Sequence, residues 1–279
     1  MRLGGPEASP RNEIWTCVQR LLFSRQVMPA SAAKPSAETA EVWLRKATLA
    51  QDAKQRATFA RKGLRARGGR DPTLRAMLLR QIYLSFMEDR RFERALKVAT
   101  EIIELNVMPD VARQDAARAC LGLDAVQEAV GHLRIACRVC PASRRAFHSW
   151  TLGSVYYLSE RYHEAMAAFR RAAVWGTTDK PLYRAQLALA TLAAGHKVDN
   201  LEGLRDALDD APCGQGYGKF VLGELAFYLG DLDEAHACLG SFVKRTAGGR
   251  VALQVALERE LEKARLLLGR LDEARIKQA

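Results

Sequence analysis

The chain has 279 residues, of which 48% are hydrophobic and 27% are charged. These values are typical of a globular protein and exclude disorder over most of the chain. Lys and Arg number 43 against 32 Asp and Glu, which gives a net charge of +11. Residues 1–75 hold 15 of the cations and only 6 of the acidic residues, so the basic excess belongs to the first quarter of the chain.

Residues 1–37 are predicted to form an N-terminal extension with one short amphipathic helix at 14–25 and a proline-containing linker. The extension lacks the unbroken apolar stretch of a secretory signal. An organelle transit peptide is the alternative, but Glu7 and Glu13 argue against it. No apolar run approaches the roughly 18 residues that would span a bilayer, and the six cysteines follow no disulfide framework. We therefore expect a cytoplasmic protein.

Residues 146–175 predict two helices joined by a tight turn at residues 159–161. Small and apolar residues recur at helical spacing on both sides of that turn: Leu152, Gly153, Tyr156, Tyr157, Tyr162, Ala165, Phe169 and Ala172. The small residues Gly153 and Ala165 would let the two helix axes approach. One such hairpin cannot bury its own apolar face, so it needs similar units on both sides.

This pattern resembles the tetratricopeptide repeat, a 34-residue helix–turn–helix unit with the pattern W-x₂-L-G-x₂-Y, then A-x₃-F, then P. The alanines that open each second helix are 34, 36, 70 and 39 residues apart: Ala95, Ala129, Ala165, Ala235 and Ala274. The resemblance implies an all-α, right-handed solenoid of five to six hairpins over residues 38–279. Its first hairpin, 38–51 and 54–67, is weakly patterned, and its last turn is expected in GRLDEA at 269–274.

By this resemblance, the first helix of each unit lines the concave face of the array, where a peptide or helix of a partner protein would bind. The predicted partner-binding residues are Arg80, Gln114, Arg118, Trp150, Ser154, Phe220 and Glu224. Trp150 is one residue away from the family's tryptophan position, so it either points into the groove or packs in the core. These positions hold no asparagine, so a clamp for C-terminal carboxylates is not expected.

The stretch from Lys54 to Arg75 holds eight cations against one acidic residue. It provides an alternative function, binding of nucleic acid or an anionic membrane surface. The residues that would carry this alternative are Arg61, Lys62, Arg65 and Arg67. A solvated helix face is the simpler interpretation, and Phe59 is the one aromatic residue available there for base stacking.

No arrangement in the sequence predicts catalysis. Cys137-x-x-Cys140 lacks a second ligand pair for zinc, and we interpret it as two small apolar side chains at a helix end. The histidines are scattered, and no Ser-His-Asp set or phosphate-binding loop is present. The sequence therefore predicts a non-catalytic adaptor or scaffold that takes no cofactor, metal or small-molecule substrate.

Overall fold

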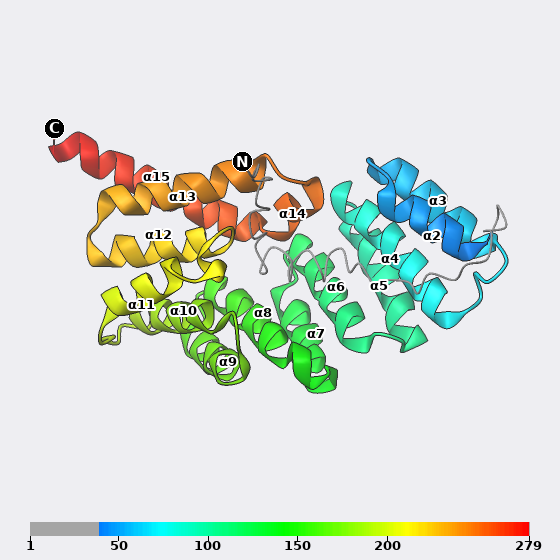
Figure 1. Ribbon diagram of the computed structural model, residues 1–279, viewed down its shortest axis with the longest axis horizontal. Helices are drawn as coiled ribbons and strands as arrows, with labels where there is room; N and C mark the ends of the chain where they lie inside the picture. The colour runs from blue at the N-terminus through cyan, green and yellow to red at the C-terminus, as the bar shows by residue number, and fades with distance from the viewer. Residues whose placement is uncertain (1–38, 279) are drawn as a thin grey trace, which may run out of the picture.

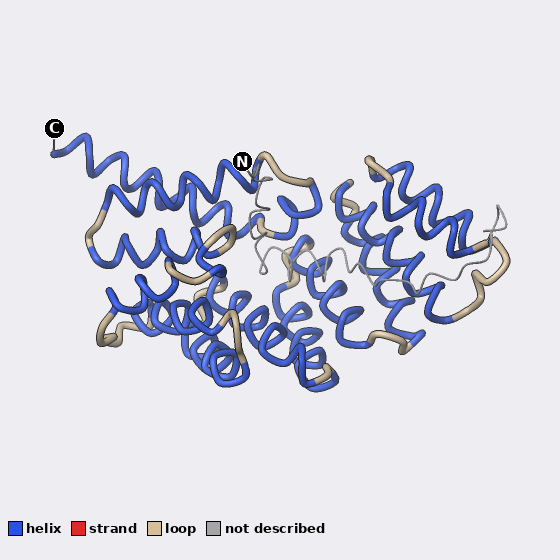
Figure 2. The backbone as a smooth tube through the Cα atoms, viewed as in Figure 1, coloured by secondary structure: helices blue, strands red, loops and turns tan. Residues whose placement is uncertain are grey.

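A computed structural model describes residues 39–278, and this part of the chain is all helical apart from one isolated bridge and the connecting turns (Figures 1 and 2). The amphipathic helix predicted at 14–25 and its linker lie outside the described residues. The helices are α2 (Ala40–Leu49), α3 (Ala53–Arg65), α4 (Pro72–Glu88), α5 (Phe92–Leu105), α6 (Pro109–Gly122), α7 (Val126–Val139), α8 (Arg145–Leu158), α9 (Tyr162–Trp175), α10 (Lys180–Ala193), α11 (Leu201–Asp209), α12 (Gly218–Leu229), α13 (Leu232–Ala247), α14 (Val251–Ala256) and α15 (Glu258–Gln278).

The first helix of five successive hairpins ends in the same turn. A residue with left-handed backbone geometry follows each of these helices, at Arg90, Asp124, Glu160, Gly195 and Gly230. The next amide then donates a hydrogen bond of 2.8–3.1 Å to a carbonyl five residues earlier, as from Arg91 to Phe86 and from His196 to Thr191. This is the geometry of a Schellman helix end. Because the left-handed residue recurs every 34–36 residues, the hairpin is the repeating unit of the structure.

Most helices pack mainly against the next one in sequence, so the hairpins form a curved row (Figure 1). One apolar core runs from α4 to α15, and α2 and α3 pack on α4 in a separate cluster. A side chain at Gly153 would place its first carbon 2.6 Å from the ring of Phe169, which is fully buried. Gly223 lies equally close to Leu239 in a later hairpin. The close approach of helices predicted at Gly153 and Ala165 is therefore confirmed.

Buried polar pairs connect consecutive hairpins within this core. Arg80 Nε donates to Asp115 Oδ2 at 2.7 Å. Asp110 accepts from Arg144 at 2.7 Å and from His148 at 2.9 Å. Burial opposes ionisation of Asp110, but the hydrogen bonds from His148 and Arg144 outweigh it and hold the pKa of this carboxyl well below its usual value. Each pair joins residues 34–38 positions apart, so these contacts also follow the repeat.

The prediction is confirmed at the first end of the row of hairpins and wrong at its last end. The weakly patterned first hairpin is present as α2 and α3, close to the predicted bounds. The turn predicted at 269–274 is wrong, because α15 continues through it without a break. Gly269 does not adopt the left-handed geometry of the earlier turns, and the continuous helix satisfies its backbone hydrogen bonds internally.

The short helix α14 turns back across the row and contacts α4, more than 160 residues earlier in the chain (Figure 1). The row of hairpins is therefore bridged by its own C-terminal segment, residues 251–278, which we call the C-terminal arm. Within residues 39–278, no helix has both the length and the apolar character required to cross a bilayer.

Candidate partner-binding groove

A cavity of about 880 Å³ lies between the row of hairpins and the C-terminal arm. One wall is made by the C-terminal ends of the first helices α4, α6, α8 and α12. The opposite wall is made by α14 and the first three turns of α15. The sequence predicted a groove lined by the first helices, but it did not predict that the chain's own end would cover part of it.

Three ion pairs hold the arm over this face. Arg90 Nη2 donates to both carboxylate oxygens of Glu258, at 2.6 and 2.9 Å. Arg259 Nη2 donates to Asp124 Oδ1 at 2.5 Å. Arg90 and Asp124 are the left-handed residues of two hairpin turns, so the repeated turns supply the contacts. The third pair joins Lys263 and Glu224.

Four of the seven predicted partner-binding residues line the cavity, and three do not. Arg118, Trp150, Ser154 and Glu224 contribute to its wall. Arg80 is instead buried in its pair with Asp115, and Gln114 and Phe220 are enclosed in the core. Phe220 stacks near Phe242 with ring centroids 5.3 Å apart and has no exposed surface. These three residues therefore lie inside the array and do not line the groove.

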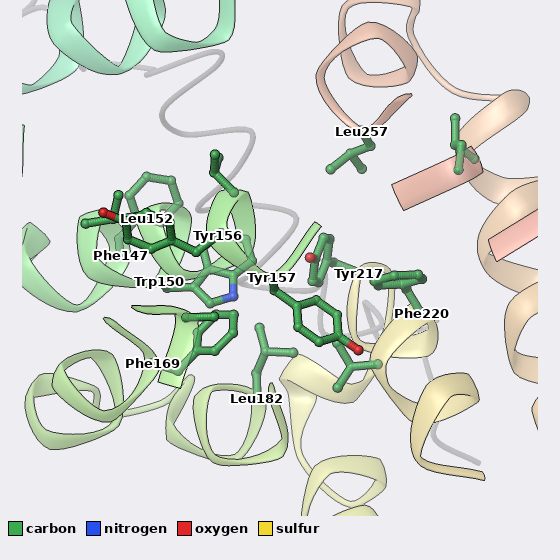
Figure 3. Close-up of a cluster of buried hydrophobic side chains, with 14 of the residues drawn as sticks. Phe147, Trp150, Leu152, Tyr156, Tyr157, Phe169, Leu182, Tyr217, Phe220 and Leu257 are labelled. Atoms are coloured by element: carbon green, nitrogen blue, oxygen red, sulfur yellow. The ribbon is translucent and has the colours of Figure 1, made fainter. Parts of the chain in front are cut away.

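Trp150 forms part of the groove's floor and is only 6% exposed. Its indole N–H donates to Gln186 of the next hairpin. Its ring meets the edge of Tyr217, with centroids 5.2 Å apart (Figure 3). The sequence left open whether Trp150 points into the groove or packs in the core, and these contacts are those of a residue packed in the core.

A buried carboxyl lies where the arm meets this floor. Glu260, on the first turn of α15, is 7% exposed, and the hydroxyl of Tyr217 lies 3.5 Å from its Oε1 atom. Burial raises the pKa of Glu260 to about 7, against the opposing effects of the Tyr217 hydrogen bond and the positive charge of Arg118. The closed arm therefore favours a protonated Glu260.

Sequence reasoning missed the most accessible apolar residues of the groove. Tyr228 on α12 and Leu266 on α15 are 45% and 58% exposed, and both line the cavity. Tyr228 lies one helical turn after Glu224, so extending the predicted first-helix positions by four residues would have found it. Leu266 had no such signal, because the arm's position over the groove is a long-range contact.

The basic residues of the alternative function lie away from this cavity. Arg61, Lys62, Arg65 and Arg67 are exposed on α3 and the turn that follows it. The ammonium of Lys62 lies 5.0 Å from the centre of the Trp43 ring, in a cation–π contact. The structure brings these four residues together on the first hairpin and none of them into the groove.

The Cys137-x-x-Cys140 pair is partly enclosed at the end of α7. Burial raises the pKa of the Cys137 thiol to about 11, and the Cys140 thiol donates to the Cys137 carbonyl. A thiol with so high a pKa is a poor nucleophile near neutral pH.

No protein-family model matches the chain. No curated protein matches it significantly. Conclusions about its function therefore depend on the fold and the groove described above.

Proposed function

We propose that the chain is a tetratricopeptide-type, right-handed solenoid that binds a segment of a partner protein in its groove and acts as a non-catalytic adaptor. The repeat of 34–36 residues between equivalent turns supports this type of unit. The five cysteines within residues 39–278 are unpaired and four of them are buried, which fits a reducing compartment such as the cytoplasm.

The observation that carries the proposal is the combination of a cavity of about 880 Å³ with exposed apolar side chains in its lining. Tyr228 and Leu266 present apolar surface within this concave site, which is typical of a ligand-binding groove. The lining also carries charges of both signs, such as those of Arg118 and Glu262, which would set the register of a bound peptide. Grooves of this kind suit an extended peptide or an amphipathic helix.

Site-specific photocrosslinking in cells tests the proposal. The photoreactive residue p-benzoylphenylalanine would replace Leu266 in the groove or, as a control, Val174 on α9. Both positions are exposed aliphatic residues on helices, and Val174 lies outside the cavity. We expect a discrete crosslinked partner from position 266 and none from position 174, with Tyr228→Ala reducing the yield. The same partner at both positions would overturn the proposal.

The four exposed cations on the first hairpin give a second candidate function, binding to an anionic partner. The triple variant Arg61→Glu, Lys62→Glu, Arg65→Glu separates the two. Phosphate contacts make binding fall steeply with salt, since each one releases counterions. We expect the partner captured at position 266 to survive this charge reversal and moderate salt. Loss of that partner in the triple variant, with retention in Tyr228→Ala, would favour the anionic-surface function.

A further inference from the structure

Three tyrosines and a buried carboxylate gather at one end of the groove. Glu224 on α12 is 2% exposed, and its Oε1 atom accepts a hydrogen bond of 3.0 Å from the Tyr157 hydroxyl. Tyr162 lies beside Tyr157, with ring centroids 5.9 Å apart. Burial, together with the negative charge of Glu224, raises the pKa of Tyr228 on the next turn of α12. We call Tyr157, Tyr162, Glu224 and Tyr228 the tyrosine pocket.

A lysine from the arm fills this pocket. The ammonium of Lys263 lies 2.6 Å from Glu224 Oε1 and 3.7 Å from the centre of the Tyr157 ring. A cation held against an aromatic face beside a buried carboxylate is attracted by both groups. The tyrosine pocket itself comes from α8, α9 and α12, whereas its occupant comes from α15, outside the regular hairpins.

The pocket has unused capacity for a hydrogen-bond donor. The second carboxylate oxygen of Glu224, Oε2, is buried and has no hydrogen-bond partner. An ionised carboxylate offers about four lone-pair sites, and an ammonium group carries three donors. Leaving a buried acceptor unpaired is unfavourable. The open oxygen therefore favours a ligand with several N–H donors over a neutral apolar one.

We propose that the tyrosine pocket is a binding site for a primary ammonium group, occupied by Lys263 in the free protein and by a lysine side chain of the partner when the groove is loaded. The identity of this occupant as part of a partner protein rests on the function proposed above. The partner's lysine would make the contacts that Lys263 loses. The pocket therefore adds specificity for lysine and couples partner binding to displacement of the Lys263 side chain, while the rest of the groove supplies most of the affinity.

Emptying the pocket and refilling it with a small amine tests its selectivity. Lys263→Ala removes the occupant and leaves Glu224 without its cation, so we expect a lower melting temperature than in the unmodified protein. The probe is n-butylammonium chloride, which has the length of a lysine side chain. The neutral control is n-butanol, at the same concentration and at ionic strength matched with NaCl.

We expect n-butylammonium at about ten times its Kd to raise the melting temperature of Lys263→Ala by about 2–3 °C. It should leave the unmodified protein unchanged, and n-butanol should have no such effect on either. The double variant Lys263→Ala, Glu224→Gln should lose the rescue. Equal shifts with amine and alcohol, or rescue that survives Glu224→Gln, would overturn the proposal.

A second measurement does not depend on the alanine variant folding. In the unmodified protein, acetylation by an N-hydroxysuccinimide ester should be at least about tenfold slower at Lys263 than at Lys97, an exposed lysine on α5, because the Lys263 ammonium is held between the Glu224 carboxylate and the Tyr157 ring and is less accessible to the reagent. Glu224→Gln should abolish that difference. Equal rates in the unmodified protein would contradict occupancy of the pocket.

The amine tests and the crosslinking test can give opposite results, so the ammonium site and the proposed function can be refuted separately. Amine rescue without groove-dependent crosslinking would leave the ammonium site and remove the adaptor function. Crosslinking at position 266 without amine rescue would leave the adaptor function and remove the lysine-binding role of the tyrosine pocket.

Discussion

The regular hairpins and the C-terminal arm are held in place by different kinds of polar contact. In the hairpins, the side chains of Arg80 and Asp115 are 7% and 1% exposed. In the arm, the pair of Arg90 and Glu258 is 55% and 38% exposed. Exposed ion pairs contribute little and are screened by salt, whereas buried ones are strongly destabilising to break.

This difference indicates where the molecule can open. From α4 onward the hairpins share one apolar core, and the arm contributes Leu261 and Leu271 to that same core. The ion pairs that join the arm to the hairpin turns, Arg90–Glu258 and Arg259–Asp124, are instead partly exposed. Exposed ion pairs break at lower free energy than the packing of a core. These contacts at the turns are therefore where the arm is best placed to respond to a partner in the groove.

The largest effect should come from breaking a buried polar pair between hairpins. Asp110→Ala leaves His148, which is fully buried, without its acceptor. We expect a loss of about 3–5 kcal/mol in the free energy of unfolding, measured by urea denaturation. The control is Arg259→Ala, which breaks the exposed pair with Asp124 without changing the left-handed turn residue, and it should cost less than about 1 kcal/mol. Similar losses in both variants would remove the distinction between hairpins and arm.

A smaller effect should come from the carboxyl beneath the arm, and it should depend on pH. The pKa of Glu260 is about 7 in the folded protein, above the ordinary value of 4.5. A carboxyl with a raised pKa costs nothing below pH 4.5 and destabilises the fold increasingly as pH rises to about 7. Glu260→Gln should therefore be about 2–3 kcal/mol more stable than the unmodified protein at pH 8 and equal to it near pH 4.

The control for this variant is Glu262→Gln, which changes an exposed carboxyl on the same helix. Its unfolding free energy should follow that of the unmodified protein at every pH. Urea denaturation between pH 4 and pH 8 measures all three proteins. A pH profile of Glu260→Gln parallel to that of the unmodified protein would contradict a buried, protonated Glu260.

The sequence predicted the regular hairpins well because their signals are local. Gly153, Ala165 and the turn at 159–161 lie within one unit, and the structure confirms all three. The repeat also predicted which helices line the groove. The position of a residue along its first helix did not, however, show whether its side chain lines the groove or is buried in the core. Arg118 and Phe220 share a predicted surface, yet Phe220 is fully buried by Phe242 of the following helix.

The C-terminal arm could not be predicted from the same local signals. GRLDEA at 269–274 matches the GDLDEA of an earlier turn in five of six residues, but it lies inside α15. The earlier sequence turns at Gly230, where the left-handed glycine ends α12 and the next helix packs on a following unit. The position of α14 against α4 depends on contacts between residues far apart in the chain, which a repeat pattern does not encode.

The smallest effect tests how tightly the hairpins themselves are packed. Gly153→Ala would place a methyl group 2.6 Å from the ring of Phe169, which has no exposed surface. We expect a cost of about 1–3 kcal/mol in unfolding free energy. Gly131→Ala is the matched control, because Gly131 is exposed within α7 and nothing lies within 4 Å of the added methyl group. Alanine should stabilise that helix by about 0.5–1 kcal/mol. Opposite signs in the two variants would show that contact across the hairpin outweighs helix propensity, and equal signs would refute tight packing at Gly153.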